Sequence, residues 1–197
     1  MKKGIVILTS LFFILTVVAN AIGEEQKLKK GDRMVLLKID KGEMCTANES
    51  DVEVSLSKEK AAKGKMYSIK YSIKKGNKGG LFIITNDSGL LRGKRGNWEG
   101  YDTLNIEYFC TAKSAISAYL NIGDEKAYNP WDGKKQAVRK VVILPGQNTL
   151  SVDITNLERT YAGEGVQDLK NMRGFFLSVP TNEDWDLYIQ DVYLEKE

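Results

Sequence analysis

The sequence contains no histidine, and this absence excludes several kinds of site. A Ser-His-Asp or Cys-His catalytic arrangement needs an imidazole as its base. With only two cysteines and no histidine, the chain also lacks the usual ligands of a zinc centre. No Gly-rich loop follows a strand pattern, as phosphate-binding motifs require. These absences exclude the histidine-dependent nucleophilic hydrolases, argue against a cysteine metal site and leave no phosphate-loop motif, so a hydrolase would have to use acidic residues.

The chain also has little net charge of either sign. Its formal charge is +3, and removing Lys2 and Lys3 with an N-terminal leader leaves 27 basic and 26 acidic side chains, a net of +1. A nucleic-acid-binding domain would carry a strongly basic surface. Local basic clusters at 27–33, 58–78 and 92–95 are therefore interpreted as solvated surface, and no nucleic-acid partner is expected.

Long hydrophobic runs are absent except at the N-terminus. Lys2 and Lys3 precede an apolar run from Ile5 to Ala19, and Ala19-Asn20-Ala21 provides the small residues of a cleavage site. The run is shorter than the roughly 20 residues of a bilayer span, so residues 1–21 are predicted to be a signal peptide. The alternative is an uncleaved N-terminal anchor. We expect a secreted or periplasmic protein with no membrane span after cleavage.

The mature chain is predicted to be one domain preceded by a short linker. Residues 22–33 are polar and Lys-rich with little to bury, which predicts a flexible segment. Residues 34–197 have the size and apolar content of a single domain with its own core. The domain boundaries are thus predicted at 21/22 and 33/34.

Short alternating segments recur along the whole domain. After the turn at Gly100, Leu104, Ile106 and Tyr108 alternate with polar residues, as a half-buried strand requires. Similar patterns predict ten strands near 34–39, 51–57, 66–74, 81–84, 103–109, 115–122, 138–144, 150–154, 174–179 and 186–194. Segments 66–74 and 81–84 are expected to form a hairpin, and 156–172 is the one segment with a possible short helix. This pattern predicts an all-β antiparallel sandwich or jelly roll.

Two further features leave alternatives open. Cys45 and Cys110 lie far apart in a chain expected in an oxidising compartment, so they form either a disulfide or two separately buried thiols. Trp98 and Tyr101 flank the Gly100 turn and are interpreted mainly as core and turn residues.

Several motifs, taken in order, resemble the galactose-binding-like jelly-roll domains, which include the carbohydrate-binding modules associated with glycoside hydrolases. The matching segments are 38–42, 54–57 with 64–65, 98–104, 144–154 and 187–194. Together they cover nearly the whole mature chain, so the resemblance implies a non-catalytic glycan-binding domain.

The resemblance also implies a structural calcium ion between the first and last strands of the fold. Asp40 matches the first acidic position, whereas the usual acid of the closing strand is replaced by Gln190, with Asp191 beside it. Calcium takes about six to eight oxygen ligands, and the Gln190 amide would supply a neutral one. The alternative is that Asp40 and Asp191 are ordinary surface acids.

A glycan site needs flat aromatic rings beside polar groups that bond to hydroxyls. The polar loop 123–135 and the strands beside it hold such residues, and so does the start of the last strand. The predicted ligand site is Tyr128, Trp131, Asp124, Arg139, Tyr119 and Trp185. The alternatives are that the tryptophans pack against the core and that Arg139 and Tyr119 are solvated or pair across strands.

No pair of carboxylates stands out among the 26 acids, so the chain is not expected to be a glycosidase or another enzyme. We predict an exported, non-catalytic module that binds a glycan or polysaccharide through loop aromatics. The alternative partner is another extracytoplasmic protein, which a structural or assembly module with no sugar site would bind.

Because Trp131 follows a proline in a polar loop, it is the loop aromatic with the least core to fill. Trp131→Ala is therefore expected to abolish retention on the bound polysaccharide while barely changing the melting temperature. Pull-down and thermal denaturation of the same preparation measure both effects. Loss of folding would show instead that Trp131 belongs to the core.

Overall fold

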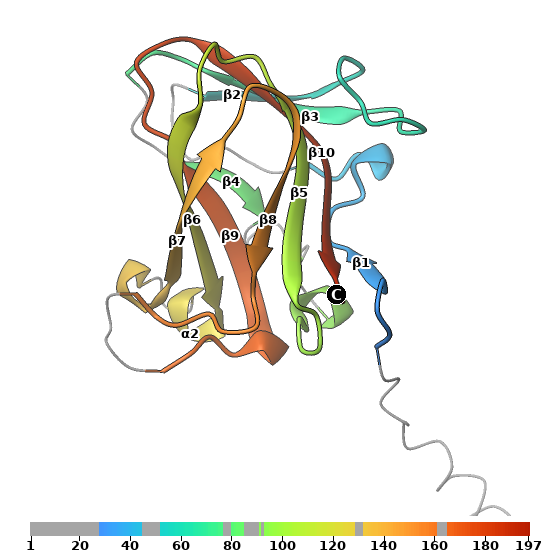
Figure 1. The fold of residues 1–197 in the computed structure, drawn as a ribbon, viewed down its shortest axis with the longest axis vertical. Helices are drawn as coiled ribbons and strands as arrows, with labels where there is room; N and C mark the ends of the chain where they lie inside the picture. The colour runs from blue at the N-terminus through green and yellow to red at the C-terminus, as the bar shows by residue number, and fades with distance from the viewer. Residues whose placement is uncertain are drawn as a thin grey trace, which may run out of the picture.

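The computed structural model describes residues 28–44, 52–76, 80–84, 91, 93–128, 132–160 and 165–197. These residues form two antiparallel sheets packed face to face, with only short helical turns at their ends (Figure 1). The predicted all-β jelly-roll sandwich is confirmed. No helix in these ranges is long and apolar enough to cross a membrane.

One sheet has six strands and is built around the last strand of the chain. Its members are β1 (Arg33–Val35), β2 (Val52–Ser57), β3 (Ser68–Ile73), β5 (Thr103–Cys110), β8 (Gly146–Asp153) and β10 (Trp185–Glu195). The order is β2-β3-β10-β5-β8, and β1 also pairs with β10. Strand β10 pairs with β3 along its first half, with β1 along its last residues and with β5 along nearly its whole length. This sheet therefore depends on β10.

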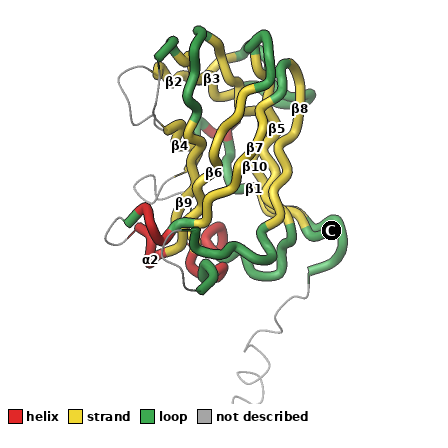
Figure 2. Tube along the Cα trace, turned by 60° about the vertical axis from the view of Figure 1, so that its left-hand side comes forward, coloured by secondary structure: helices red, strands yellow, loops and turns green. Residues whose placement is uncertain are grey.

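The second sheet has four strands in the order β4-β9-β6-β7. These are β4 (Gly80–Ile84), β9 (Met172–Ser178), β6 (Ile116–Asp124) and β7 (Ala137–Ile143). The turns are η1 (Ile39–Lys41), η3 (Gly93–Gly96), α2 (Glu125–Tyr128), η4 (Gly133–Lys135) and η5 (Leu169–Asn171). Figure 2 shows α2 at one end of the sandwich, beyond β6 and β9.

The core lies between the two sheets and is filled by alternate residues of each strand. Leu104 and Ile106 point inward from β5, as their alternation predicted. Trp98 is completely buried, and its indole N–H donates to the carbonyl of Arg95 at 2.9 Å. Its ring packs edge-on against Phe175 of β9, with ring centroids 6.0 Å apart. Trp98 thus connects the turn before β5 to the opposite sheet.

Three local predictions from the sequence are wrong. The first strand ends at Val35, and Ile39 begins a 3-10 turn instead of ending a strand. Segments 66–74 and 81–84 do not form a hairpin, because β3 pairs with β2 and β10 while β4 pairs with β9 in the other sheet. In 156–172, the described residues form a bridge between Glu158 and Val166 and the turn η5, without an α-helix.

Because Trp98 is fully buried, Trp98→Ala is expected to lower the free energy of unfolding by about 3–5 kcal/mol. The loss combines the apolar contact with Phe175, the indole hydrogen bond and the cavity left behind. Urea denaturation measures it. Met66→Ala is the matched control, because Met66 is 60% exposed and its truncation should change stability by less than about 0.5 kcal/mol. Equal effects of the two substitutions would contradict the assignment of Trp98 to the core.

Candidate functional site

The outer face of the four-stranded sheet carries an open aromatic side chain. Along β6 the buried residues Ala118, Leu120 and Ile122 alternate with outward-pointing Tyr119 and Asn121. Tyr119 is 47% exposed although it lies in the middle of a strand. A large aromatic ring left half open at the centre of a sheet face is available to a flat ligand.

The neighbours of Tyr119 follow from the strand registers. Lys140 of β7 lies directly across from it on one side and Ser178 of β9 on the other. The Asn121 amide donates to the Ser178 hydroxyl at 3.3 Å. Val142, two residues further along β7 and across from Ser117, is 48% exposed. The sheet thus presents one ring, apolar surface and short polar groups together.

Residues with the same outward register make up this surface, which we call the β6 face. Its members, taken from the described side chains, are Ser117, Tyr119, Asn121, Val138, Lys140, Val142, Phe176 and Ser178.

On the outer face of the six-stranded sheet, in contrast, the segment between β2 and β3 covers part of β5 and β10. The Lys60 ammonium lies 4.3 Å from the centre of the Phe109 ring, and the Tyr188 hydroxyl donates to Glu59 at 2.8 Å. The Gln190 amide donates to the Lys60 carbonyl at 2.5 Å. These contacts hold residues 59 and 60 across β5 and β10, so those two aromatic rings serve packing within the protein.

The charges on that covered face are also paired. Lys70 forms an ion pair with Asp186 at 3.0 Å, and Arg33 pairs with Glu195 at 2.9 Å. The hydrogen bond to Asp186 raises the pKa of Lys70 to about 12, with a further contribution from Tyr188. Both cations therefore already have a counter-charge within the protein and are not available to a ligand.

Asp124, predicted to contact a ligand, is instead fully buried at the end of β6. Its carboxylate accepts hydrogen bonds from the Arg159 guanidinium at 2.5 Å and from the Asp168 backbone N–H at 2.8 Å. Arg159 and Gln167 both donate to the carbonyl of Lys135, and Gln167 also accepts from the Asp124 N–H. The prediction for Asp124 is wrong, because its carboxylate joins the loops at one end of the sandwich and has no open surface.

Tyr128 and Trp185 do not converge on one groove. Tyr128 ends α2, whereas Trp185 begins β10 at the other end of the sandwich (Figure 1). Burial raises the pKa of the Tyr128 phenol. Trp185 is 4% exposed and its indole donates to Thr181 at 3.0 Å. Ligand contact by Trp185 and by the Tyr128 hydroxyl is therefore contradicted, and Trp131 lies outside the described residues.

Arg139 does not line the outer sheet face as predicted. It lies opposite the buried Leu120 in the register of β6 and β7, on the side of the sheet that faces the core. Because β7 is an edge strand, the guanidinium reaches past it and donates to the Asn156 carbonyl at 2.8 Å. Arg139 thus ties β7 to the segment after β8.

The two acids expected to hold calcium are bonded to N–H donors and an ammonium. Asp40 accepts from the backbone N–H groups of Met66 and Tyr67, at 2.8 and 3.2 Å. Asp191 lies 3.6 Å from the Lys65 ammonium. Within the described ranges no three acidic, cysteine or histidine side chains gather as a metal site. These partners do not fit a calcium ion, because a cation already lies beside Asp191 and the amide N–H groups point at Asp40.

Of the two cysteines, Cys110 lies in the described residues. Cys110 is a free, buried thiol at the end of β5, and burial raises its pKa. This matches the alternative of buried thiols for Cys110, while Cys45 lies outside the described residues.

Comparison with protein-family models and with curated proteins gives no match. Among solved structures, a family 11 carbohydrate-binding module from Clostridium thermocellum, in complex with a β-1,3-1,4-mixed-linked tetrasaccharide, superposes with a TM-score of 0.53 at 11% identity. The match covers 89% of this chain and 94% of that one. The solution structure of CtCBM11 gives a TM-score of 0.61 at 12% identity, over 85% of this chain and 96% of that one.

An exo-β-agarase also contains this fold, with a TM-score of 0.59 at 12% identity. The match covers 83% of this chain but only 25% of the agarase. Identities this low establish the fold alone. The chain therefore has the jelly-roll fold of carbohydrate-binding modules, and its ligand must be argued from its own surface.

Asp124 and Arg159 form an ion pair whose side chains are 0% and 7% exposed. Asp124→Asn leaves the guanidinium buried without its counter-charge, so the free energy of unfolding should fall by about 3–5 kcal/mol. Urea denaturation of Asp124→Asn, Arg159→Met and the double variant should show a smaller loss for the double variant than for the summed single variants.

The control is Glu99→Gln, which removes an exposed ion pair with Lys170 and should cost less than about 1 kcal/mol. If Asp124→Asn cost no more than Glu99→Gln, Asp124 would not hold these loops together.

Proposed function

We propose that this protein is an exported, non-catalytic module that binds a glycan across the β6 face. The observation that carries the proposal is Tyr119, an aromatic ring 47% exposed in the middle of a strand, where burial or a polar residue is the usual outcome. Sugar rings have apolar C–H surfaces, and a flat aromatic ring is the side chain that matches them.

The groups around Tyr119 support recognition as well as adsorption. Asn121 offers an amide and Ser178 a hydroxyl, both of which bond to sugar hydroxyls. They already contact each other at 3.3 Å, so their positions are set before a ligand arrives. A preorganised polar pair beside an aromatic ring lowers the entropy cost of binding a flexible polysaccharide.

A sheet face also suits the shape of a polysaccharide. The rows of outward side chains on β9, β6 and β7 run side by side, so a ligand chain could lie across several of them. The family 11 module that shares this fold was solved with a tetrasaccharide, which supports the ligand class. Export by the predicted signal peptide would bring the module to such polymers outside the cytoplasm.

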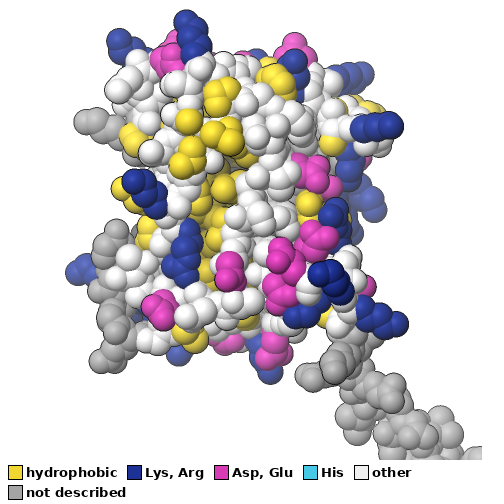
Figure 3. Space-filling view, viewed as in Figure 1, with side chains coloured by type: hydrophobic (Ala, Val, Ile, Leu, Met, Phe, Trp, Pro, Cys, Tyr) yellow, Lys and Arg dark blue, Asp and Glu magenta, His cyan; other side chains and the backbone are white. Residues whose placement is uncertain are grey.

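A second function is favoured by the apolar edge next to the β6 face. Val142 and Leu144 are 48% and 47% exposed, and Figure 3 shows hydrophobic side chains gathered over the region of β7 and β8. Such a patch suits an assembly module that binds another extracytoplasmic protein. The two functions are distinguished by whether Tyr119 contributes to the binding of free polysaccharide.

The test is retention of the chain from residue 22 onward on a glycan array and on insoluble polysaccharides. Tyr119→Ala should weaken retention about tenfold or more, because a stacked ring is lost, while the melting temperature stays unchanged. Val166→Ala is the control, since Val166 is 55% exposed and is not part of the β6 face.

Binding of the wild type that Tyr119→Ala leaves intact would move the sugar site away from the β6 face. No retention on any glycan would overturn the glycan proposal and favour a protein partner.

A further inference from the structure

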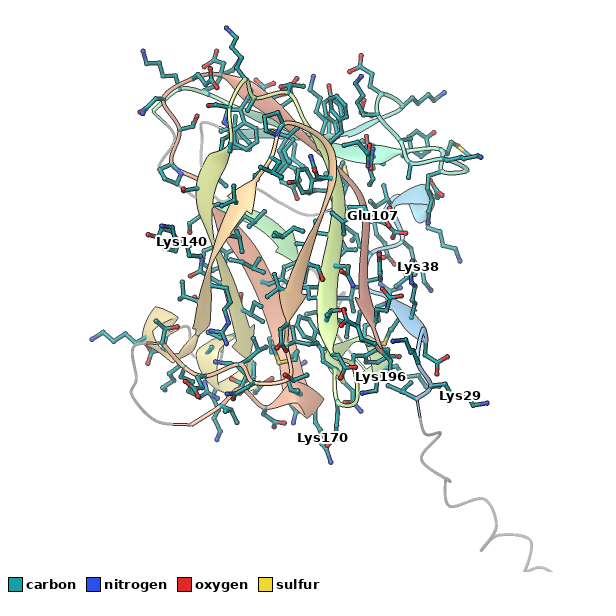
Figure 4. All side chains as sticks on the ribbon, in the orientation of Figure 1. Lys29, Lys38, Glu107, Lys140, Lys170 and Lys196 are labelled. Atoms are coloured by element: carbon teal, nitrogen blue, oxygen red, sulfur yellow. The ribbon has the colours of Figure 1, made fainter. Side chains whose placement is uncertain are left out.

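The β6 face carries a positive charge that the protein itself does not neutralise. Lys140 is exposed on β7, directly across from Tyr119 in the strand register. Figure 4 shows its side chain extending away from the sandwich, on the side opposite Lys38 and Glu107. None of the ion pairs formed among the described residues includes Lys140.

Some other lysines of the described residues do form ion pairs. Lys70 on the opposite sheet pairs with Asp186, Lys170 with Glu99 and Lys196 with Asp102. In each pair the ammonium nitrogen lies no more than 3.3 Å from a carboxylate oxygen. Within the described ranges, Lys140 shares its lack of an ion pair with other surface lysines, such as Lys38, and differs from them in lying directly across from the exposed Tyr119 ring.

The described part of the β6 face contains no acidic side chain. The carboxylates that end β6 and begin α2 are already used, since Asp124 is buried against Arg159 and Glu125 bonds to Arg173. A protein carboxylate commonly accepts hydrogen bonds from the hydroxyls of a neutral sugar. A face with a free ammonium and no described carboxylate is better matched to a ligand that carries its own anionic groups.

We propose that the ligand of the β6 face is an anionic polysaccharide, bearing carboxylate or sulfate groups, and that Lys140 determines this preference. The inference rests on the proposed glycan function. One sugar ring lies on Tyr119 while the anionic group of the same or the adjoining sugar bonds to the Lys140 ammonium. Asn121, two residues along β6, and Ser178, across from Tyr119 on β9, offer an amide and a hydroxyl to the hydroxyls of the sugar.

The charge of the chain as a whole does not produce this preference. The mature chain has a net charge of only +1, so general attraction to polyanions is weak. Ionic contacts at an exposed site are screened by salt, with a Debye length of about 8 Å near physiological ionic strength. Selective binding should therefore depend on Lys140 and should weaken as salt is raised.

The experiment compares matched polysaccharides that differ only in charge. Affinity electrophoresis or calorimetry is run on polygalacturonate against its methyl ester, and on carrageenan against the same carrageenan after chemical desulfation. The wild-type chain from residue 22 should prefer the anionic member of at least one pair by about tenfold, as a charge-assisted hydrogen bond provides. The pair that shows the preference identifies carboxylate or sulfate as the recognised group.

Lys140→Gln should remove most of this preference and its salt dependence while keeping binding to the neutral member. Lys38→Gln makes the same change of charge on the opposite side of the molecule and should leave the preference intact. Equal binding of charged and neutral partners, or a preference that survives Lys140→Gln, would overturn the role of Lys140 and leave the glycan function standing. Failure to bind any polysaccharide would overturn both proposals.

Discussion

Backbone pairing along β10 is the interaction on which the rest of the structure depends. This strand, the last in the chain, hydrogen-bonds to β3 and β1 on one side and to β5 on the other. Its inward residues, such as Leu187 and Ile189, fill the core, while outward Tyr188 and Gln190 bond to the segment between β2 and β3. The same strand therefore completes one sheet and holds a loop segment over part of that sheet's outer surface.

Several of the charged side chains described in the molecule hold its segments together. Asp124 and Arg159 fix the loops at one end, Lys70 and Asp186 link adjacent strands, and Arg139 ties an edge strand to a loop. Buried or paired groups of this kind are poor ligand contacts because their bonding capacity is already satisfied. Lys140 and Tyr119, in contrast, are both open and lie directly across from each other on one sheet.

Most of the sequence prediction rests on strand alternation. Alternation predicted strand and core positions, but it did not predict which strands pair. It located Leu104 and Ile106 in the core and placed Tyr119 on a strand beside the ligand loop. The alternation of β6 and β7 also contained the signal for Asn121 and Lys140, because residues two apart share a face. The same reasoning misplaced Arg139, whose long side chain turns around the edge of the sheet, and it made a hairpin of β3 and β4.

The sequence by itself determined the all-β class, the approximate strand positions and the absence of histidine-based chemistry, because local periodicity and composition specify these directly. Only the tertiary structure decided which strands pair, which outer face is covered and which polar groups are used internally. Asp124, Trp185 and Tyr119 all looked like ligand residues in the chain. In the structure Asp124 and Trp185 are buried and Tyr119 is exposed. This difference arises from contacts with segments distant in sequence, which no local pattern encodes.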